Sequence, residues 1–288
     1  MQSLHASLDP VTSIKSGQVF LWEKHGDSWY GVHGDHIVKI RQTGRELFEF
    51  SSFPEDKTWH RRMFRLDDDV RTIFGEISRD LFVRRLVRSY PGLRLMRQEP
   101  HQCIFSFVCA SNTNIPMIRR MLYNLTRKFG RPVNVDGIEF FTFPSVEDID
   151  RAGADELRSC GLGYRVKAIK SAARAIASGQ IDFDALTSAT YEEAKKELLR
   201  IYGIGNKIAD CILLFSLEKL DAFPIDVWIA RALSQYYSWL HQEEFGDKLT
   251  LRQYEELSSD ARIHFGKYAG YAQQYLFYHM RQTAGKKW

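Results

Sequence analysis

The hydrophobic pattern of this chain changes near residue 67, and this change constrains the fold more than any other feature. Before it, residues 17–50 contain short apolar and aromatic runs that are interrupted twice by His-Gly-Asp and once by Thr-Gly. Turn residues at such intervals between β-forming runs are typical of an antiparallel meander. From residue 67 to residue 90 the apolar residues recur at nearly helical spacing, and Asp67 or Asp68 could cap the start. The sequence therefore predicts an α+β protein with an N-terminal twisted antiparallel sheet.

Helices are predicted over most of the remaining chain. One runs from Asn114, a predicted N-cap, to Phe129, with Pro116 in its first turn and Gly130 as its stop. The others are expected at 147–160, 164–178, 191–201, 206–217, 227–239, 251–263 and 268–282. We divide the chain into a β-rich domain at 1–105 and a mainly helical region at 106–288, with a helix-hairpin-helix at about 191–217.

Composition excludes several classes of protein. At 288 residues with 44% hydrophobic residues, the chain can bury more than one core. It has no run of 18 apolar residues and no basic segment leading into an apolar stretch at the start, so neither a membrane span nor a secretory signal is expected. We expect an intracellular protein, in the cytoplasm or nucleoid if it is prokaryotic. The net charge of +4 is compatible with nucleic acid binding but does not establish it.

The four cysteines, Cys103, Cys109, Cys160 and Cys211, are scattered and form no CxxC pair. Neither a zinc ribbon nor a disulfide framework is indicated. We expect reduced thiols that lie mostly in the core, and no side-chain metal site is evident.

The segment 191–226 contains the residues that indicate a function. Two helical stretches flank the tight turn Gly203-Ile204-Gly205, where glycines permit positive φ angles and let a foreign backbone approach. The second helix then begins with free backbone N–H groups at the positive end of its dipole, which suits a DNA phosphate. Because many helix–turn–helix connections contain glycine, this turn alone favours a structural connection over DNA binding.

Lys207 and Asp226 indicate that this segment could also catalyse a reaction. Lys207 lies in the first helical turn, where the dipole disfavours a cation and pushes the amine towards the neutral, nucleophilic form. Cys211 is four positions later and shares its helix face. Asp226 follows Pro224 and is a natural N-cap, whose ionised carboxylate could also stabilise positive charge on a sugar. An exposed lysine, a core thiol and a simple cap are the alternatives.

These residues resemble a known superfamily. Gly203-Ile204-Gly205-Asn206-Lys207, followed 19 residues after the lysine by Asp226, is similar to the helix-hairpin-helix (HhH-GPD) DNA glycosylases, and within them to the 8-oxoguanine DNA glycosylases. The resemblance continues in residues 17–22, 95–115, 160–165 and 266–277. It implies a bifunctional glycosylase and AP lyase, both hydrolase and lyase, that excises 8-oxoguanine from duplex DNA in base excision repair.

The resemblance also implies roles for single residues. Lys207 would attack the deoxyribose, form a Schiff base and permit strand cleavage by β-elimination, while Asp226 would stabilise the developing charge. The base must be flipped out of the stack. Its pocket would be formed by Gly17, Cys211, Phe215, Gln273 and Phe277. The carbonyl of Gly17 would accept the extra N7 proton of 8-oxoguanine.

The DNA contacts implied by the resemblance lie elsewhere in the chain. Asn112 would fill the space left by the flipped nucleotide, Tyr164 would wedge into the stack, and Arg165 would contact the orphaned cytosine. The remaining implied contacts are Met117, Gly203, Gly205, Ile208 and Trp228.

Two positions depart from the family pattern. Met117 stands where an arginine usually contacts the opposite cytosine, and a thioether cannot donate a hydrogen bond. We therefore expect a relaxed preference for cytosine opposite the lesion. Trp228 stands where a histidine often contacts a phosphate, and it offers an N–H group but no positive charge.

Other functions remain to be weighed. An endonuclease III-like enzyme for oxidised pyrimidines usually has a four-cysteine iron–sulfur cluster after the aspartate, but no cysteine follows Cys211. An alkylpurine glycosylase lacks a lysine at the position of Lys207. A non-catalytic helix-hairpin-helix DNA-binding protein would need neither Lys207 nor Asp226, and a glycosylase for other oxidised bases is a further alternative. We expect a monomer with no required cofactor and no iron–sulfur cluster, although the hairpin backbone could hold a monovalent cation.

Overall fold

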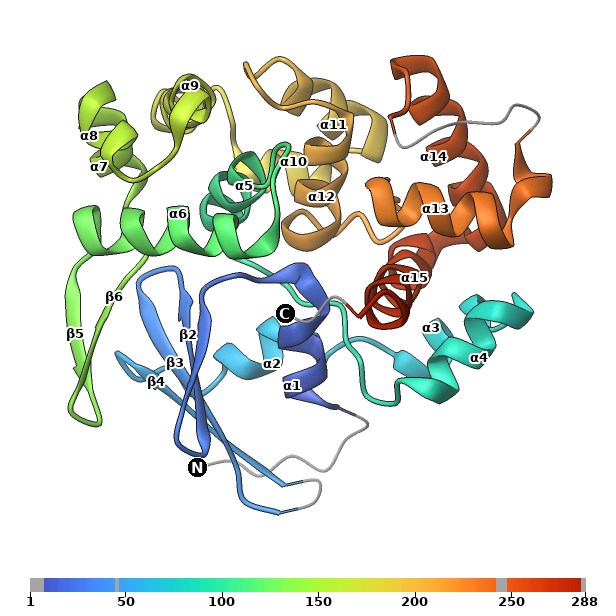
Figure 1. The fold of residues 1–288 in the computed structure, drawn as a ribbon, viewed down its shortest axis with the longest axis horizontal. Coiled ribbons are helices and arrows are strands. Elements are labelled where there is room, and N and C mark those ends of the chain that lie inside the picture. Colours follow the sequence, from blue (N-terminus) through green and yellow to red (C-terminus); the bar gives the residue numbers. More distant parts are fainter. Residues whose placement is uncertain (1–7, 45–46, 242–247, 286–288) are drawn as a thin grey trace.

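The computed structural model describes residues 8–44, 47–241 and 248–285. Its N-terminal part is a four-stranded antiparallel sheet in which each strand pairs with the next along the chain. The strands are β1 (Trp22–His25), β2 (Ser28–His33), β3 (His36–Gln42) and β4 (Phe48–Phe53). Figure 1 shows this sheet below the helices. The predicted α+β class and the meander are confirmed.

The two faces of the sheet belong to different cores. On one face, Val38, Ile40 and Phe50 pack against Trp59 of α2 (Trp59–Met63), forming a small core of the N-terminal part. On the other face, residues such as Ile37 join a larger core that continues into the helices. Because this larger core is shared, the sheet and the helices form one packed body. The boundary at residue 105 falls inside α5 (Pro100–Cys109), and the division at that point stays a prediction.

The rest of the described chain is mainly helical (Figure 1). Its further helices are α1 (Pro10–Ser13), α3 (Val70–Ile77), α4 (Leu81–Ser89), α6 (Ile115–Phe129), α7 (Val146–Arg151), α8 (Ala154–Ser159), α9 (Val166–Ala177), α10 (Phe183–Ser188), α11 (Tyr191–Leu199), α12 (Asn206–Ser216), α13 (Val227–Tyr236), α14 (Leu251–Phe265) and α15 (Ala269–Thr283). Short helical turns occupy Ile14–Gln18, Gly163–Arg165, Ser238–Leu240 and Gly266–Tyr268.

Several local predictions need correction. The predicted helix from residue 67 is two helices, α3 and α4, and their caps are Asp69 and Asp80, not Asp67 or Asp68. The predicted helix 147–160 is likewise divided into α7 and α8, because the chain becomes extended at Ala152 and Gly153. A hairpin of β5 (Pro132–Val135) and β6 (Ile138–Phe141) was not predicted, since two four-residue strands give too short an alternation to detect.

The boundaries of α6 agree with the prediction, but the reason for Gly130 differs. Asn114 caps the helix by accepting from the N–H of Met117, and the helix ends at Phe129. Gly130 is extended, not left-handed. A Cβ atom there would lie 2.0 Å from the carbonyl oxygen of Thr142. Close approach of the β5–β6 hairpin therefore requires the glycine.

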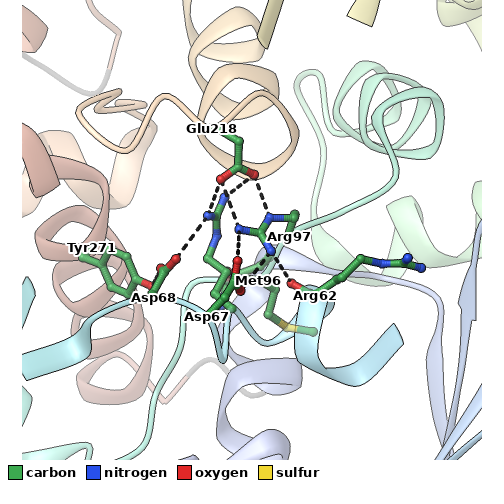
Figure 2. Close-up of polar contacts among 9 residues, drawn as sticks. Arg62, Asp67, Asp68, Met96, Arg97, Glu218 and Tyr271 are labelled. Carbon is green, nitrogen blue, oxygen red and sulfur yellow. Dashed lines mark hydrogen bonds and ion pairs between the residues drawn. The ribbon is translucent and has the colours of Figure 1, made fainter. Parts of the chain in front are cut away.

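An ion-pair network ties the end of α12 to the N-terminal part. Glu218, just after α12, accepts from Arg65 Nη1 at 2.7 Å and from Arg97 Nε at 2.8 Å. The Arg65 side chain is fully buried. Asp68 accepts from Tyr271 of α15 at 2.5 Å, and Figure 2 shows these carboxylates gathered around the two arginines. The network therefore joins α12, α15 and the segments on both sides of α3 and α4.

We predict that Glu218→Gln destabilises the protein by about 2 kcal/mol at pH 7, a value reduced from that of a buried pair because Glu218 is about one-third exposed. Burial alone would raise the pKa of Glu218, but the hydrogen bond from Arg97 and the charge of Arg65 outweigh it and hold the pKa at about 2. This carboxylate therefore stabilises the fold above the unfolded pKa of about 4.3 and loses that contribution as the pH falls towards 2.

Urea denaturation at several pH values measures this effect. The difference between wild type and Glu218→Gln should shrink as the pH drops from 5 to 2. The control is Glu256→Gln, because Glu256 is 53% exposed and pairs only on the helix surface with Arg252, so a change within about 0.5 kcal/mol is expected. A Glu218→Gln effect as small as the control would contradict the proposed weight of the network.

Candidate active site

The hairpin between α11 and α12 has a positive φ angle at Gly203, as predicted, but not at Gly205. Gly203 has φ +88°, and a Cβ atom there would lie 2.3 Å from Cβ of Ala168 on α9. Gly205 caps α12 in an extended conformation, and no described atom comes within 4 Å of the place where its Cβ would stand. Gly203 is thus required by packing, whereas Gly205 leaves the start of α12 open to an approaching group.

Lys207 lies in the first turn of α12 and is partly buried. Its Nζ is 5.4 Å from the ring centroid of Phe107 on α5, and Phe107 stacks on Phe215 with 5.3 Å between centroids. One turn along α12, burial raises the pKa of the Cys211 thiol to about 12, against the opposing charge of Lys207. Cys211 therefore stays protonated at neutral pH.

Asp226 begins α13 as predicted. One of its oxygens, Oδ1, accepts from the N–H groups of Trp228 at 3.0 Å and Ile229 at 2.9 Å. The pKa of this carboxyl is raised, because burial outweighs the charge of Lys207, the two backbone N–H groups and the charge of Arg281, which lower it. The carboxylate therefore lies in the field of two cations from two different helices.

Helix α15 supplies one wall of the site. Gln273, Phe277 and Arg281 are spaced four residues apart and so share one face. Gln273 donates from Nε2 to the carbonyl oxygen of Pro224 at 2.9 Å, which fixes its side chain beside the segment leading to Asp226. Its Oε1 is buried and has no hydrogen-bond partner among the described residues. An unsatisfied buried acceptor is costly, so this atom is suited to a ligand donor.

Gly17 lies against the same face of α15. It has φ +87°, and a Cβ atom there would lie 2.8 Å from Cε1 of Phe277 and 2.7 Å from Nη1 of Arg281. Only a glycine lets the backbone come this close. The neighbouring carbonyl of Ser16 accepts from Gln274 of α15 at 3.1 Å. The first and last parts of the described chain therefore pack directly against each other.

A second group of predicted residues surrounds the carbonyl of Ser111, and we call Asn112, Tyr164 and Arg165 the Ser111 cluster. Tyr164 donates to this carbonyl at 3.1 Å, and Arg165 donates to it from Nη2. The Arg165 guanidinium also lies 4.6 Å from the Tyr164 ring centroid. Asn112 is exposed with φ +47°, a conformation that asparagine tolerates better than most residues.

The remaining predicted DNA contacts are more scattered. Met117 is 41% exposed in the first turn of α6. Trp228 is partly buried, with the Arg231 guanidinium 5.5 Å from its ring. Ile208 is buried, so a DNA contact at this position would come from its backbone N–H. Arg281 and Phe107 are the two residues at the site that the sequence did not predict. The spacing of Arg281 from Phe277 was the available signal.

No metal centre or membrane segment is found in the described parts of the chain. Among these residues, no group of three or more His, Cys, Asp or Glu could hold a metal ion. None of the described helices is long and apolar enough to cross a membrane. All four cysteines are buried free thiols, as expected.

Comparison with known proteins identifies the family. Residues 3–104 match "8-oxoguanine DNA glycosylase, N-terminal domain", and residues 105–257 match "HhH-GPD superfamily base excision DNA repair protein". The chain is 30% identical to N-glycosylase/DNA lyase OGG1 of Arabidopsis thaliana over 95% of its own length and 77% of that protein.

Solved structures with a similar fold support this family assignment. MBOgg1 in complex with a low-affinity DNA ligand has a TM-score of 0.87 and 30% identity, covering 97% of this chain and 94% of that one. The Clostridium acetobutylicum 8-oxoguanine glycosylase/lyase bound to double-stranded DNA with cytosine opposite 8-oxoG has a TM-score of 0.85 and 27% identity, covering 96% and 93%.

The fold and the site thus define a helix-hairpin-helix base excision DNA repair enzyme. Within that superfamily the chain belongs to the 8-oxoguanine DNA glycosylase family. Its activity is that of an 8-oxoguanine DNA glycosylase/lyase in base excision repair.

We predict that Gly17→Ala lowers both stability and excision of 8-oxoguanine. The left-handed backbone disfavours alanine by about 1 kcal/mol, and the new methyl group would push against Phe277 and Arg281. The control is Gly137→Ala, because Gly137 has a similar φ of +80° but open space around it. It should lose similar stability and keep full activity, as measured by thermal unfolding and single-turnover excision. Equal activities of the two variants would contradict a role of Gly17 in the pocket.

Proposed function

We propose that Lys207 is the nucleophile and Asp226 its carboxylate partner. The lone pair of the neutral amine attacks C1′ of the damaged nucleotide, and the electrons of the N-glycosidic bond leave with the base, which takes up a proton. The sugar ring then opens to a Schiff base on Lys207. Loss of a C2′ proton breaks the C3′–O bond and cleaves the strand. Lys207 lies close enough to Asp226 for its positive charge to lower the pKa of that carboxyl. This proximity is the observation that carries the proposal.

The negative charge of Asp226 has a defined task in this scheme. Positive charge develops on the sugar as the base leaves, and a fixed carboxylate stabilises it without reorganisation. The cap bonds to Trp228 and Ile229 hold the carboxylate in one orientation. The protonated Cys211 beside Lys207 offers a neutral neighbour that does not compete as a nucleophile.

We further propose how the base is recognised. The flipped base would lie between Cys211 and Phe277, with the free Oε1 of Gln273 accepting from its Watson–Crick edge. Guanine has an acceptor at N7, whereas 8-oxoguanine carries a proton there. The Gly17 carbonyl would accept this proton, and the contact of Gly17 with Phe277 supports its place at the pocket.

The partner in this proposal is double-stranded DNA containing 8-oxoguanine. The open start of α12 would bind a phosphate of the damaged strand, and a monovalent cation on the hairpin carbonyls would strengthen that contact. Asn112, Tyr164 and Arg165 would act at the vacated position and the orphaned base, for which Arg165 must release Ser111. We propose a monomer that works on intracellular DNA without a required cofactor.

We predict that Lys207→Gln forms no covalent adduct with 8-oxoguanine DNA. Wild type should be trapped on the DNA by borohydride, which reduces the Schiff base. The control is Lys196→Gln, an exposed lysine on α11, which should be trapped as efficiently as wild type. If Lys207→Gln nicked lesion DNA at the normal rate, the proposed mechanism would be wrong.

We also propose that Met117 relaxes the choice of the opposite base. Met117 is exposed and cannot donate to cytosine, so an arginine introduced there has room to do so. Met117→Arg should increase discrimination for cytosine over the other bases by roughly 5- to 100-fold, as expected for one added base contact. Excision rates on duplexes with each of the four bases opposite 8-oxoguanine, and with an oxidised pyrimidine, measure this.

The matched control for this substitution is Met117→Leu, which keeps a similar volume and adds no donor. It should leave the pattern of opposite-base rates unchanged. A wild-type enzyme whose activity collapses opposite every base except cytosine would refute the proposed role of Met117.

A further inference from the structure

A concave surface beside the Ser111 cluster is rich in positive charge. It has a volume of about 840 Å³ and is formed by α8, α9 and the turn before α9. The cationic residues of its lining are Arg158, Lys167, Lys170 and Arg174, and no acidic residue lines it in the described part of the chain. We call this surface the α9 groove. A groove lined by one sign of charge attracts a polyanion more strongly than scattered surface charges do.

Three of these cations are available to a ligand. Arg174 is 76% exposed, and its closest acidic oxygen, on Asp150, is 3.8 Å away. Arg158 is 61% exposed and pairs with Asp155, which is 95% exposed. Ion pairs this exposed contribute little, so a phosphate can replace them. Lys170 differs, because its ammonium donates to the carbonyl oxygens of residues 150 and 152 and so serves the fold.

The α9 groove is continuous with two parts of the proposed DNA-binding surface. Tyr164 of the Ser111 cluster lies at its edge. Lys167 lies 4.1 Å from the ring centroid of Tyr202, the residue before Gly203 of the hairpin. Lys167 and Arg174 are two helical turns apart, or about 10 Å along the axis. This distance is long enough for the two side chains to reach different phosphates of one strand.

The position of the groove indicates which of the two DNA strands it would contact. Lys207 must reach a sugar of the damaged strand, and it lies against Phe107 of α5. Ser111 lies just beyond the C-terminal end of α5, four residues after Phe107, and Tyr164 and Arg165 are attached there. Helix α5 packs against both α12 and α9 and lies between them in Figure 1. The groove on α9 and the proposed nucleophile on α12 therefore lie on opposite sides of α5, and the groove adjoins Tyr164, one of the residues assigned to the vacated site.

We propose that the α9 groove binds the sugar–phosphate backbone of the undamaged strand, through Arg158, Lys167 and Arg174. The proposal rests on the proposed function, since that function places Lys207 on the damaged strand and Arg165 at the orphaned base. The groove holds the second strand while the first is distorted by base flipping. Its contacts are to phosphates, so they add affinity and register but no sequence preference.

The test uses the double variant Arg158→Gln/Arg174→Gln in the full-length chain. Both it and its reference carry Lys207→Gln, so that lesion DNA is bound without reaction. Affinity for a duplex with one 8-oxoguanine is measured between 50 and 200 mM salt. The slope of log affinity against log salt should become shallower by about 1.8, or 0.9 for each lost phosphate contact. An unchanged slope would overturn the proposal.

The matched control is Arg131→Gln. Arg131 has the same exposure as Arg174, 76%, and a similar distance of 3.9 Å to an acidic oxygen, on Asp35, but it lies outside the groove. It should leave the slope unchanged. A slope change equal to that of one groove arginine would mean that any exposed arginine has this effect, and the groove would lose its special role.

The strand is assigned with neutral methylphosphonate linkages placed in one strand at a time. When they replace the phosphates of the undamaged strand next to the lesion, the difference between the double variant and its reference should disappear. When they are in the damaged strand, the difference should remain. The reverse result would place the groove on the damaged strand and overturn the proposal.

Failure of the proposed function would look different. In that case Lys207→Gln alone would still nick lesion DNA, whatever the salt slopes show. In a background with Lys207 present, the double variant should reach the wild-type rate of borohydride trapping at saturating protein. A trapping rate that stays low at saturation would mean that the two arginines act in the reaction, and the groove proposal would be wrong.

Discussion

The attachment of the short turn Ile14–Gln18 to the body of the protein is the constraint on which the contact between Gly17 and Phe277 depends. The buried side chain of Gln18 donates to the carbonyl oxygen of Arg94 at 2.7 Å and accepts from the N–H of Met96 at 2.7 Å. Gln98 donates to the backbone oxygen of Gln18 at 2.8 Å. Each of these buried groups would be costly if it lost its partner. Together they hold Gly17 against Phe277, so the N-terminal part is needed for the site and not only for the fold.

Helix α12 is fixed at its two ends and in its middle. Lys207 is at its start, and the Glu218 network holds the residues just after its end (Figure 2). Between them the fully buried Asp210 accepts from the hydroxyls of Tyr191 and Tyr254, each at 2.7 Å. The Tyr254 hydroxyl in turn accepts from the N–H of Ile225 at 3.2 Å, next to Asp226. The helix that carries Lys207, the proposed nucleophile, therefore also positions the segment that leads to Asp226.

The sequence predicted those features of the fold that depend on residues close together in the chain. The hairpin glycines, the cap at Asp226 and the boundaries of α6 follow from local backbone chemistry, and all three agree with the structure. Three consecutive aspartates at 67–69 compete as caps, and local pattern could not choose among them. The pocket between Gly17 and α15 joins residues more than 250 positions apart, so it could be expected only through the resemblance to the family. The bonds from Tyr164 and Arg165 to Ser111 were not expected, because the sequence alone indicates an aromatic residue at a helix start and a solvated arginine, whereas Arg165 is buried.

Arg281 shows how the charges of the site remain balanced during the proposed reaction. Asp226 must be ionised when Lys207 is neutral, since attack requires the free amine. With Lys207 as its single cation, the carboxylate would lose that support at the moment of attack, and burial would favour its protonation. The Arg281 guanidinium stays charged through this step and acts on Asp226 from α15. The cation that lowers the pKa of Asp226 from this side therefore comes from the same face of α15 that carries Gln273 and Phe277.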